Sequence, residues 1–267
     1  MIRQPVVAGT FYQSDAAILR AQIEGFIDKG CKKEKVLGIV APHAGYDYSG
    51  KVAGAVFSHS IIPESVLILA PNHTGYGPPY SIWPDGSWRT PLGDVAIDVE
   101  LVQELISECD LLEKDKDAHK AEHSAEVMLP FLQYFNPKIK LAVIVISSGN
   151  LNDLKTIGTS ISSALRRLRL DALVIASSDM THYESQQSAN KKDKMAINEI
   201  LVLNEDGLYD KVREMNISMC GIFPAISMLV CSKGRGAKAG ELVLYKTSGD
   251  TTGDYDQVVG YAGIIIR

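Results

Sequence analysis

Cysteine is scarce in this chain of 267 residues, and the four cysteines include no CxxC pair. In a chain of this size, scattered cysteines indicate reduced thiols and not a disulfide framework. Long apolar runs are absent too, because no stretch approaches the roughly 18 to 20 residues needed to span a bilayer. The first residues become polar too soon for a secretory signal. We therefore expect a cytoplasmic protein with no membrane partner.

Basic charge is not in excess, since 27 Lys and Arg residues stand against 32 Asp and Glu residues and leave a formal net charge of −5. A nucleic-acid binder normally shows a basic patch or stripe, so we expect no nucleic-acid partner. The chain also lacks the GxSxG sequence of α/β-hydrolases and the GxxxxGK[ST] phosphate-binding loop. These absences argue against two common kinds of α/β enzyme.

The chain does contain ample apolar material for a core, since 46% of its residues are hydrophobic. Short apolar runs predict buried strands at 36–41, 66–70, 141–147 and 172–177. Longer amphipathic segments predict helices at about 15–29, 50–59, 98–109, 122–135, 151–168, 187–203, 206–214 and 220–231. Strands at 241–248 and 257–266, separated by a turn-rich segment, predict an antiparallel hairpin. The pattern predicts an α/β fold, with one three-layer αβα domain over residues 1–267 and a mixed, largely parallel central sheet.

Histidines follow three of the predicted strands within a few residues. His43, His73 and His182 each lie just beyond the end of such a strand. Open α/β sheets bind ligands outside the carboxyl ends of their strands, and imidazole is the commonest metal ligand in proteins. A single histidine of this kind is usually an ordinary hydrogen-bonded residue. Three at successive strand ends favour a metal or acid–base pocket.

Cys220 precedes an apolar helical segment. A helix N-terminus lowers the pKa of a thiol toward the thiolate, which binds metals and attacks electrophiles. A lone cysteine is also commonly a small buried hydrophobic residue, which we expect of Cys31, Cys109 and Cys231. The position of Cys220 leaves both interpretations open.

His119, His123 and Glu126 form a second set of candidate ligands, because spacings of four and three place them on one face of a helix. Their order differs from that of HExxH zinc sites, where the glutamate lies between the histidines. The charged residues around them favour instead the solvated start of a helix, with His119 in solvent. A third interpretation directs His123 and Glu126 into the pocket at the strand ends. His59 is expected to be structural.

Aromatic residues accompany the strand-end histidines. Tyr46, Tyr76 and Tyr183 lie within three residues of them and predict aromatic pocket walls with hydroxyl donors. Trp83 and Trp88 follow in a Pro- and Gly-rich segment, where they form either a lid or ordinary loop packing.

Seven segments in order along the chain closely resemble the Memo family: VAGTFY, APHAGYDYSG, PNHTGYG, EHSAEVMLPF, SSDMTHY, MCGIFP and DYDQVVGYAGI. The resemblance implies a fold similar to that of class III extradiol dioxygenases, which are non-haem iron enzymes that open catechol rings. It also implies that His43, His73 and Cys220 are metal ligands, with Asp179 and His182 beside them. The implied cofactor is Fe(II) or copper, with zinc as a third option.

Eukaryotic members of the Memo family are described as adaptors for phosphotyrosine receptor peptides and as iron- or copper-binding redox proteins. Microbial relatives are often encoded beside a radical-SAM protein and an AMMECR-type protein, so the resemblance makes both candidates for partners. No feature of the sequence indicates the substrate or the oligomeric state.

The implied thiolate ligand departs from the dioxygenases, which hold Fe(II) with two histidines and one carboxylate. A thiolate favours Cu(I) or zinc and is itself oxidisable. One hypothesis is a redox or oxygenase-like enzyme acting on a small molecule, with His182 as the acid–base residue and Asp179 fixing its tautomer. The alternative is a non-catalytic binding or adaptor protein whose pocket takes a peptide or a small anion.

Overall fold

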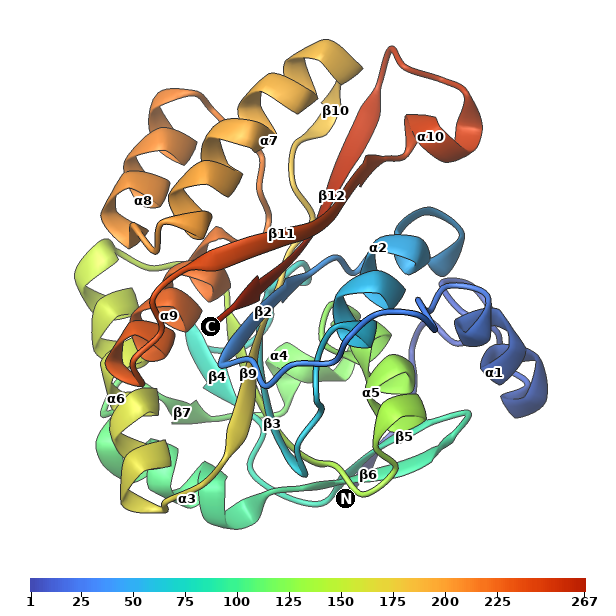
Figure 1. Ribbon diagram of the computed structural model, residues 1–267. Coiled ribbons are helices and arrows are strands. Elements are labelled where there is room, and N and C mark those ends of the chain that lie inside the picture. Colours follow the sequence, from blue (N-terminus) through green and yellow to red (C-terminus); the bar gives the residue numbers. More distant parts are fainter.

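The four apolar runs lie together at the centre of a twelve-stranded sheet in a computed structural model that describes residues 1–267. Four parallel strands occupy this centre, in the spatial order β8 (Lys140–Ile146), β3 (Ser65–Pro71), β9 (Ala172–Ser177) and β2 (Gly38–Ala41). Apart from Lys140, all of their residues are buried, because helices cover both faces of the sheet (Figure 1). The parallel arrangement brings the carboxyl ends of these strands to one edge.

Shorter strands extend the sheet beyond β8. One of them, β6, runs parallel to β8, and β5 forms an antiparallel pair with β6. The strands of this side are β1 (Ile2–Arg3), β4 (Tyr80–Ile82), β5 (Ser87–Thr90), β6 (Gly93–Ile97) and β7 (Glu113–Lys114). They were not anticipated from the sequence, because each has at most five residues and no continuous apolar run.

The C-terminal hairpin is present as predicted. Strand β11 (Gly240–Thr247) pairs antiparallel with β12 (Val258–Ile266), and a short helix, α10 (Gly249–Thr252), lies in the connection. The end of β12 pairs antiparallel with β2, which joins the hairpin to the parallel centre. The start of β12 pairs with β10 (His182–Glu184), so the hairpin also borders the segment that carries His182.

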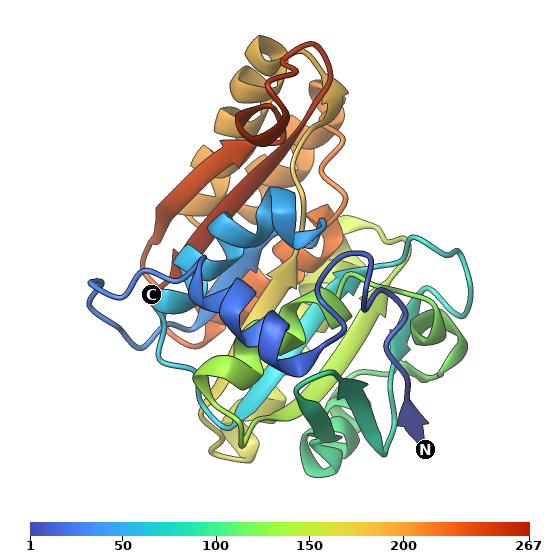
Figure 2. The same cartoon turned by 90° about the vertical axis from the view of Figure 1, so that its right-hand side faces the viewer.

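Helices form a layer on each face of the sheet, which confirms the three-layer αβα fold (Figures 1 and 2). One layer consists of α1 (Ala16–Glu24), α2 (Tyr46–Ser58) and α5 (Leu129–Phe135). The other layer consists of α3 (Val99–Glu108), α6 (Leu151–Arg167), α7 (Gln186–Leu201), α8 (Glu205–Glu214) and α9 (Ile222–Gly234). The amphipathic pattern is clearest in α6, whose buried Leu154, Ile157, Ile161 and Leu165 recur at helical spacing.

The helix predicted over 122–135 is wrong in its first half. Helix α4 (Asp117–Lys120) ends early, a loop follows, and a 3₁₀ turn, η1 (Glu126–Met128), leads into α5. Pro130 lies in the first turn of α5. Proline has no N–H to donate and clashes with the preceding turn, so it favours a helix start over a helix interior.

The two tryptophans form no lid. Trp83 and Trp88 are both completely buried, with ring centroids 5.7 Å apart in an edge-to-face arrangement. Trp83 follows β4, Trp88 lies in β5, and both belong to the hydrophobic core, which is ordinary packing.

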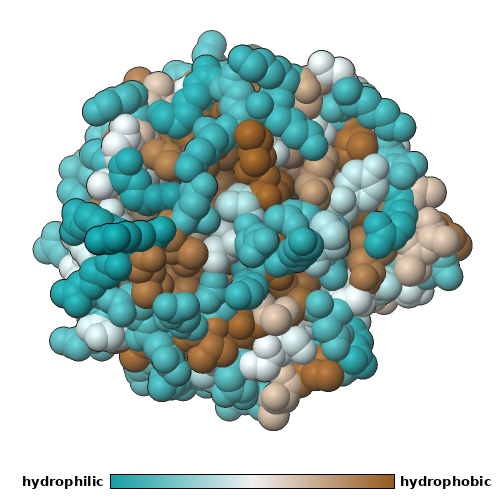
Figure 3. All heavy atoms as spheres, turned by 60° about the horizontal axis from the view of Figure 1, so that its bottom comes forward, coloured by the Kyte–Doolittle hydropathy of each residue, from teal (hydrophilic) through white to brown (hydrophobic).

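The outer surface is mostly hydrophilic. On the face shown in Figure 3, hydrophobic side chains lie in separate patches between hydrophilic ones. Scattered apolar residues of this kind are normal on the surface of a folded protein. None of the helices has both the length and the apolar character that crossing a membrane requires.

Candidate metal centre

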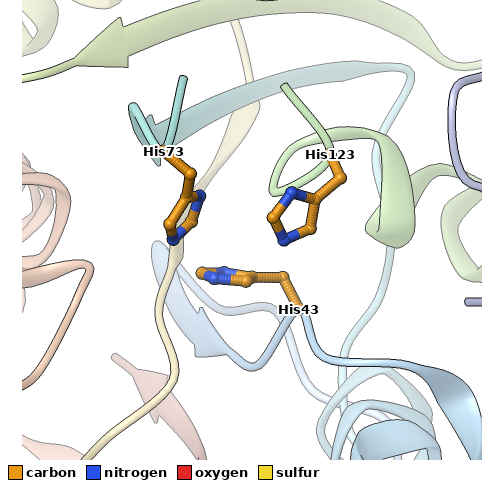
Figure 4. Close-up of side chains that lie close together, drawn as sticks. All are labelled: His43, His73 and His123. Atoms are coloured by element: carbon orange, nitrogen blue, oxygen red, sulfur yellow. The ribbon is translucent and has the colours of Figure 1, made fainter. Parts of the chain in front are cut away.

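Three imidazoles converge beyond the carboxyl ends of the parallel strands. His43 follows β2, His73 follows β3, and His123 comes from the loop between α4 and η1. One ligand nitrogen of each ring lies within 4.8 Å of those of the other two. The rings of His73 and His123 are stacked at 4.8 Å, and both meet the His43 ring edge-on (Figure 4).

The protein fixes the tautomer of His43. Its Nδ1 lies 2.7 Å from the hydroxyl of Ser177, and that hydroxyl donates to the carbonyl oxygen of Ser124 at 2.8 Å. The Ser177 oxygen must therefore accept the proton on Nδ1, which leaves the lone pair of His43 on Nε2. Burial, together with the nearby His73 and His123, holds the pKa of His43 well below its usual value. A neutral imidazole with a free Nε2 is the form that binds a metal ion.

Glu122 holds His73 in the same way. Its Oε1 lies 2.9 Å from Nδ1 of His73, and its Oε2 accepts a hydrogen bond from the backbone N–H of the same residue. Burial alone would lower the pKa of His73, but the hydrogen bond and the charge of Glu122 outweigh it and raise that pKa. Burial would likewise raise the pKa of Glu122, yet its bonds to His73 lower that pKa to about 2. The pair leaves Nε2 of His73 directed toward the other rings.

His123 shares the same carboxylate, because its Nδ1 lies 3.5 Å from Oε1 of Glu122. The ring also packs edge-on against Phe11 at 5.0 Å. Burial lowers the pKa of His123, so this imidazole, like that of His43, is neutral near pH 7. All three rings therefore carry their Nδ1 against protein groups and present Nε2 to one another.

Cys220 and Asp179 lie beside this group of imidazoles. The Sγ of Cys220 is 3.4 Å from Nε2 of His43, and one carboxylate oxygen of Asp179 is 3.9 Å from the same nitrogen. The other oxygen of Asp179 accepts a hydrogen bond from the backbone N–H of His43 at 2.9 Å, and the N–H of Asp179 donates to Cys220 Sγ at 3.2 Å. Burial raises the pKa of the Asp179 carboxyl.

The expected lowering of the Cys220 pKa is wrong. Burial, and next the charge of Asp179, raise the pKa of this thiol, so it is protonated in the metal-free protein. Cys220 also lies two residues before the start of α9, which reduces the effect of the helix N-terminus. The thiol lies close to His43 because the backbone of the next residue, Gly221, packs against the end of β9. A Cβ at Gly221 would lie 2.1 Å from the carbonyl oxygen of Ser177, so only glycine fits there.

Asp179 does not orient His182, contrary to the expectation from their spacing. Nδ1 of His182 lies 2.9 Å from the carbonyl oxygen of Ser218, and its backbone N–H donates to the Ser218 hydroxyl at 2.7 Å. His182 is near enough for its charge to lower the pKa of His43. Tyr183 beside it is strongly exposed and has a positive φ of 58°, a strained backbone conformation for a residue other than glycine.

The remaining candidates from the sequence lie away from the imidazoles. His119 is completely buried between Trp83 and Trp88, not in solvent, and no helix face joins it to His123 and Glu126. Glu126 forms a buried ion pair with Arg3 at 2.6 Å.

The predicted tyrosines also occupy different places. Tyr46 lies in the core, where its ring packs on Phe131 and its hydroxyl donates to the carbonyl of Val127. Tyr76 is exposed. Of these three tyrosines, Tyr183 has its ring edge-on to that of His182, with ring centroids 5.9 Å apart.

The residues that hold the imidazoles are not predicted from the sequence, namely Glu122, Ser177 and Ser218. The charged residues around His119 and His123 predict a solvated helix start, but Glu122, one of these residues, is completely buried. Ser177 ends an otherwise apolar strand, and a polar residue at that position was a usable signal. No pattern in the sequence connected Ser218 with His182.

The residues present fit a first-row transition metal ion. Tetrahedral nitrogen ligands at about 2.1 Å from a metal lie about 3.4 Å apart, so donors within 4.8 Å of one another need only small shifts. A nitrogen and a sulfur ligand of the same ion lie about 3.6 Å apart, close to the 3.4 Å between His43 and Cys220. Hydrogen bonds to the far nitrogens of metal-binding histidines are the usual supporting arrangement.

Comparison with known proteins agrees with this description. The chain matches the profile of the Memo-like protein family over residues 3–265. It is 42% identical to a MEMO1 family protein of Methanopyrus kandleri, covering 100% of this chain and 99% of that protein. It is 44% identical to a MEMO1 family protein of Aquifex aeolicus, covering 99% and 98% of the two chains.

A solved structure supports the fold alone. The crystal structure of an uncharacterised protein from Escherichia coli K12 has a TM-score of 0.53 and 13% sequence identity, and the match covers 86% of this chain and 100% of that chain. The profile match and the two relatives extend over nearly the whole sequence. The chain therefore belongs to the Memo family.

Proposed function

We propose that this protein is a metal-dependent redox enzyme with oxygenase-like activity on a small molecule. Its metal ligands in this proposal are His43, His73, His123 and Cys220. The observation that carries the proposal is the convergence of three imidazoles whose ligand atoms lie within 4.8 Å of one another. A purely structural role would not require three separate Nδ1 contacts, which hold the three rings close together beside the Cys220 thiol.

The donor set suits Fe(II) or copper, with zinc as the third option. Imidazole nitrogen binds all three metals, and the Cys220 thiol adds affinity for Cu(I) and zinc. When bound, such an ion supplies Lewis-acid and redox chemistry in the pocket. The thiol must lose its proton to become a ligand, so binding through Cys220 releases a proton.

His182 is the acid–base residue of this proposal. Its Nδ1 faces the carbonyl oxygen of Ser218 and must carry a proton there, which leaves Nε2 to accept or donate one. The side chain is partly exposed, so a proton on it can exchange with water. Asp179 is a positioning residue, because it holds the backbone of His43 and lies beside its Nε2.

The metal content of untagged protein purified from its native host tests this proposal. We expect iron or copper at about one ion per chain, and less than about a tenth of that in His43→Gln and His73→Gln. Circular dichroism and urea unfolding show whether each variant is folded. Two variants are used so that the test still holds if one of them does not fold. Equal metal content in wild type and both folded variants would contradict the ligand assignment.

The redox part of the proposal needs its own measurement. Loaded protein should pass reversibly between two oxidation states with a chemical reductant and O₂, without releasing the metal. A protein that binds only zinc, which has no redox chemistry, would contradict this part. A protein that binds no metal but captures a peptide or a small anion through His43 and His73 would instead be a binding protein.

A further inference from the structure

Asp28, Cys31 and His59 form a second group of possible ligands, outside the candidate metal centre. One donor atom of each lies within 4.8 Å of those of the other two. His59 caps the C-terminal end of α2, whereas His43 lies just before its N-terminal end. With 13 residues in α2 and about 1.5 Å of rise per residue, the two groups are roughly 20 Å apart. We propose that Asp28, Cys31 and His59 bind Zn²⁺ as a second, independent metal site.

His59 is arranged as a ligand. Its Nδ1 lies 2.9 Å from the carbonyl oxygen of Ala55, one turn earlier in α2. A carbonyl only accepts, so Nδ1 carries the proton and the lone pair is on Nε2. This is the same arrangement that supports metal-binding histidines, in which a carbonyl or carboxylate holds the far nitrogen.

The loop that carries Asp28 and Cys31 is tied to the end of α2. The backbone N–H of Asp28 donates to the hydroxyl of Ser58 at 3.0 Å, and the N–H of Glu34 donates to the carbonyl of His59 at 2.9 Å. One carboxylate oxygen of Asp28 accepts from the N–H of Gly30 at 2.9 Å. The loop is therefore fixed on both sides of Cys31, which limits the ordering that metal binding would require.

The thiol of Cys31 lies 3.1 Å from the carbonyl oxygen of Ser58 and 3.2 Å from that of Asp28, so without a cation it donates its proton to one of them. Burial, and next the charge of Asp28, raise the pKa of Cys31, which keeps the thiol protonated near neutral pH. Zinc binding would displace this proton to solvent and turn the sulfur away from the two carbonyls.

The chemistry of the donors selects the ion. Nitrogen, sulfur and carboxylate oxygen together suit zinc, whereas Ca²⁺ and Mg²⁺ prefer oxygen ligands alone. Three protein ligands leave the fourth position of tetrahedral zinc for water or a small ligand. A cavity of about 320 Å³, lined by Asp28, His59, Lys51 and apolar residues of α2 and β11, adjoins the group and can admit one. Lys51 is the only lysine or arginine in this lining, and its charge opposes cation binding.

Alkylation of individual cysteines tests the site in the full-length, untagged protein. Metal-free protein is treated with limiting iodoacetamide, with and without Zn²⁺, and the modification of each cysteine is measured by peptide mass spectrometry. At a Zn²⁺ concentration of about ten times Kd, we expect alkylation of Cys31 to slow about tenfold. We expect the zinc protection of Cys31 to disappear in Asp28→Asn and His59→Gln. In Lys51→Gln, less zinc should give the same protection of Cys31.

Cys220 in the same digest separates the two sites. His43→Gln removes a ligand of the candidate metal centre, so it should change zinc protection of Cys220 and leave that of Cys31 intact. An alkylation rate of Cys31 that zinc does not change would overturn the second site. Protection of Cys31 that persists in both folded Asp28→Asn and His59→Gln would overturn it as well. Neither result depends on whether the proposed redox function is correct.

Discussion

Glu122 contacts His73 through both of its carboxylate oxygens, one at the backbone N–H and one at Nδ1, 2.9 Å away. The same carboxylate approaches Nδ1 of His123 and accepts from the backbone N–H of Ser124 at 2.9 Å. One buried side chain thus sets the orientation of two candidate ligands. Its influence on the pocket should be large although it is not itself a ligand.

We predict that Glu122→Gln lowers metal affinity about 10- to 100-fold, because loss of a group that holds a metal-binding histidine typically has this effect. The amide keeps the size of the side chain but removes the charge. Its NH₂ group only donates, so the amide cannot accept hydrogen bonds at both positions as the carboxylate does. Competition with a chromophoric chelator measures the affinity. Glu100→Gln, an exposed glutamate at the start of α3, is the matched control. Equal affinities in the two variants would show that Glu122 has no part in positioning His73.

The Cys220 thiol should decide which metal the pocket prefers. Sulfur is a soft donor, so Cys220→Ser should lower the affinity for Cu(I) by more than about tenfold and that for Fe(II) much less. Anaerobic titration against competing chelators gives both constants. Cys109→Ala removes a thiol at the end of α3 and should change neither. A similar loss for both metals in Cys220→Ser would indicate general damage to the pocket and not loss of a soft ligand.

The sequence was sufficient for the part of the site that depends on strand ends. Apolar runs identify the strands, and parallel topology brings the residues after them to one edge, so His43 and His73 were expected to meet. The position of the loop that carries Glu122 and His123 could not be predicted in this way. The carbonyls of His119, in α4 just before this loop, and of Glu122 accept hydrogen bonds from Arg3, which lies more than a hundred residues earlier in the chain. No local pattern encodes a contact of that kind.

The Arg3–Glu126 ion pair should contribute strongly to stability. Both side chains are almost fully buried, and Glu126 also accepts from the Tyr12 hydroxyl at 2.7 Å. Removing one member of a buried pair leaves the other charge uncompensated, so we expect Arg3→Met to reduce the free energy of unfolding by about 3 to 5 kcal/mol. Urea unfolding measures the change.

Arg89→Met is the matched control for this pair. Arg89 bonds Asp94 at 2.7 Å on the surface, where water screens the charges, so its loss should have a far smaller effect. If both variants lose the same stability, the buried pair has no special role. Metal affinity of folded Arg3→Met adds a second readout, because the guanidinium also holds the loop that positions Glu122.

His119 should make the protein sensitive to acid. Ser81 donates to Asp115 at 3.1 Å, so it accepts from Nε2–H of His119 at 2.9 Å, and Nδ1 is left as a buried, unpartnered acceptor. A proton on Nδ1 would have no acceptor and would add a charge near Arg3. Burial, and next the charge of Arg3, lower the pKa of His119 to about 3, although Asp115 and Glu122 oppose this shift.

The sign of the effect follows from the two states of the chain. The pKa of His119 is near 6.5 in the unfolded chain and about 3 in the folded protein. The contribution of neutral His119 to the free energy of unfolding is therefore fully present above pH 6.5 and is lost progressively as the pH falls from 6.5 to 3. At pH 4 the loss attributable to His119 should be on the order of 3 kcal/mol. Urea unfolding of wild type and His119→Gln at pH 7, 5 and 4 isolates this contribution, because the other titrating groups cancel in the difference. The variant should be less stable than wild type at pH 7, and the gap should narrow as the pH falls; a gap that stays constant would show that His119 takes up its proton equally in both states.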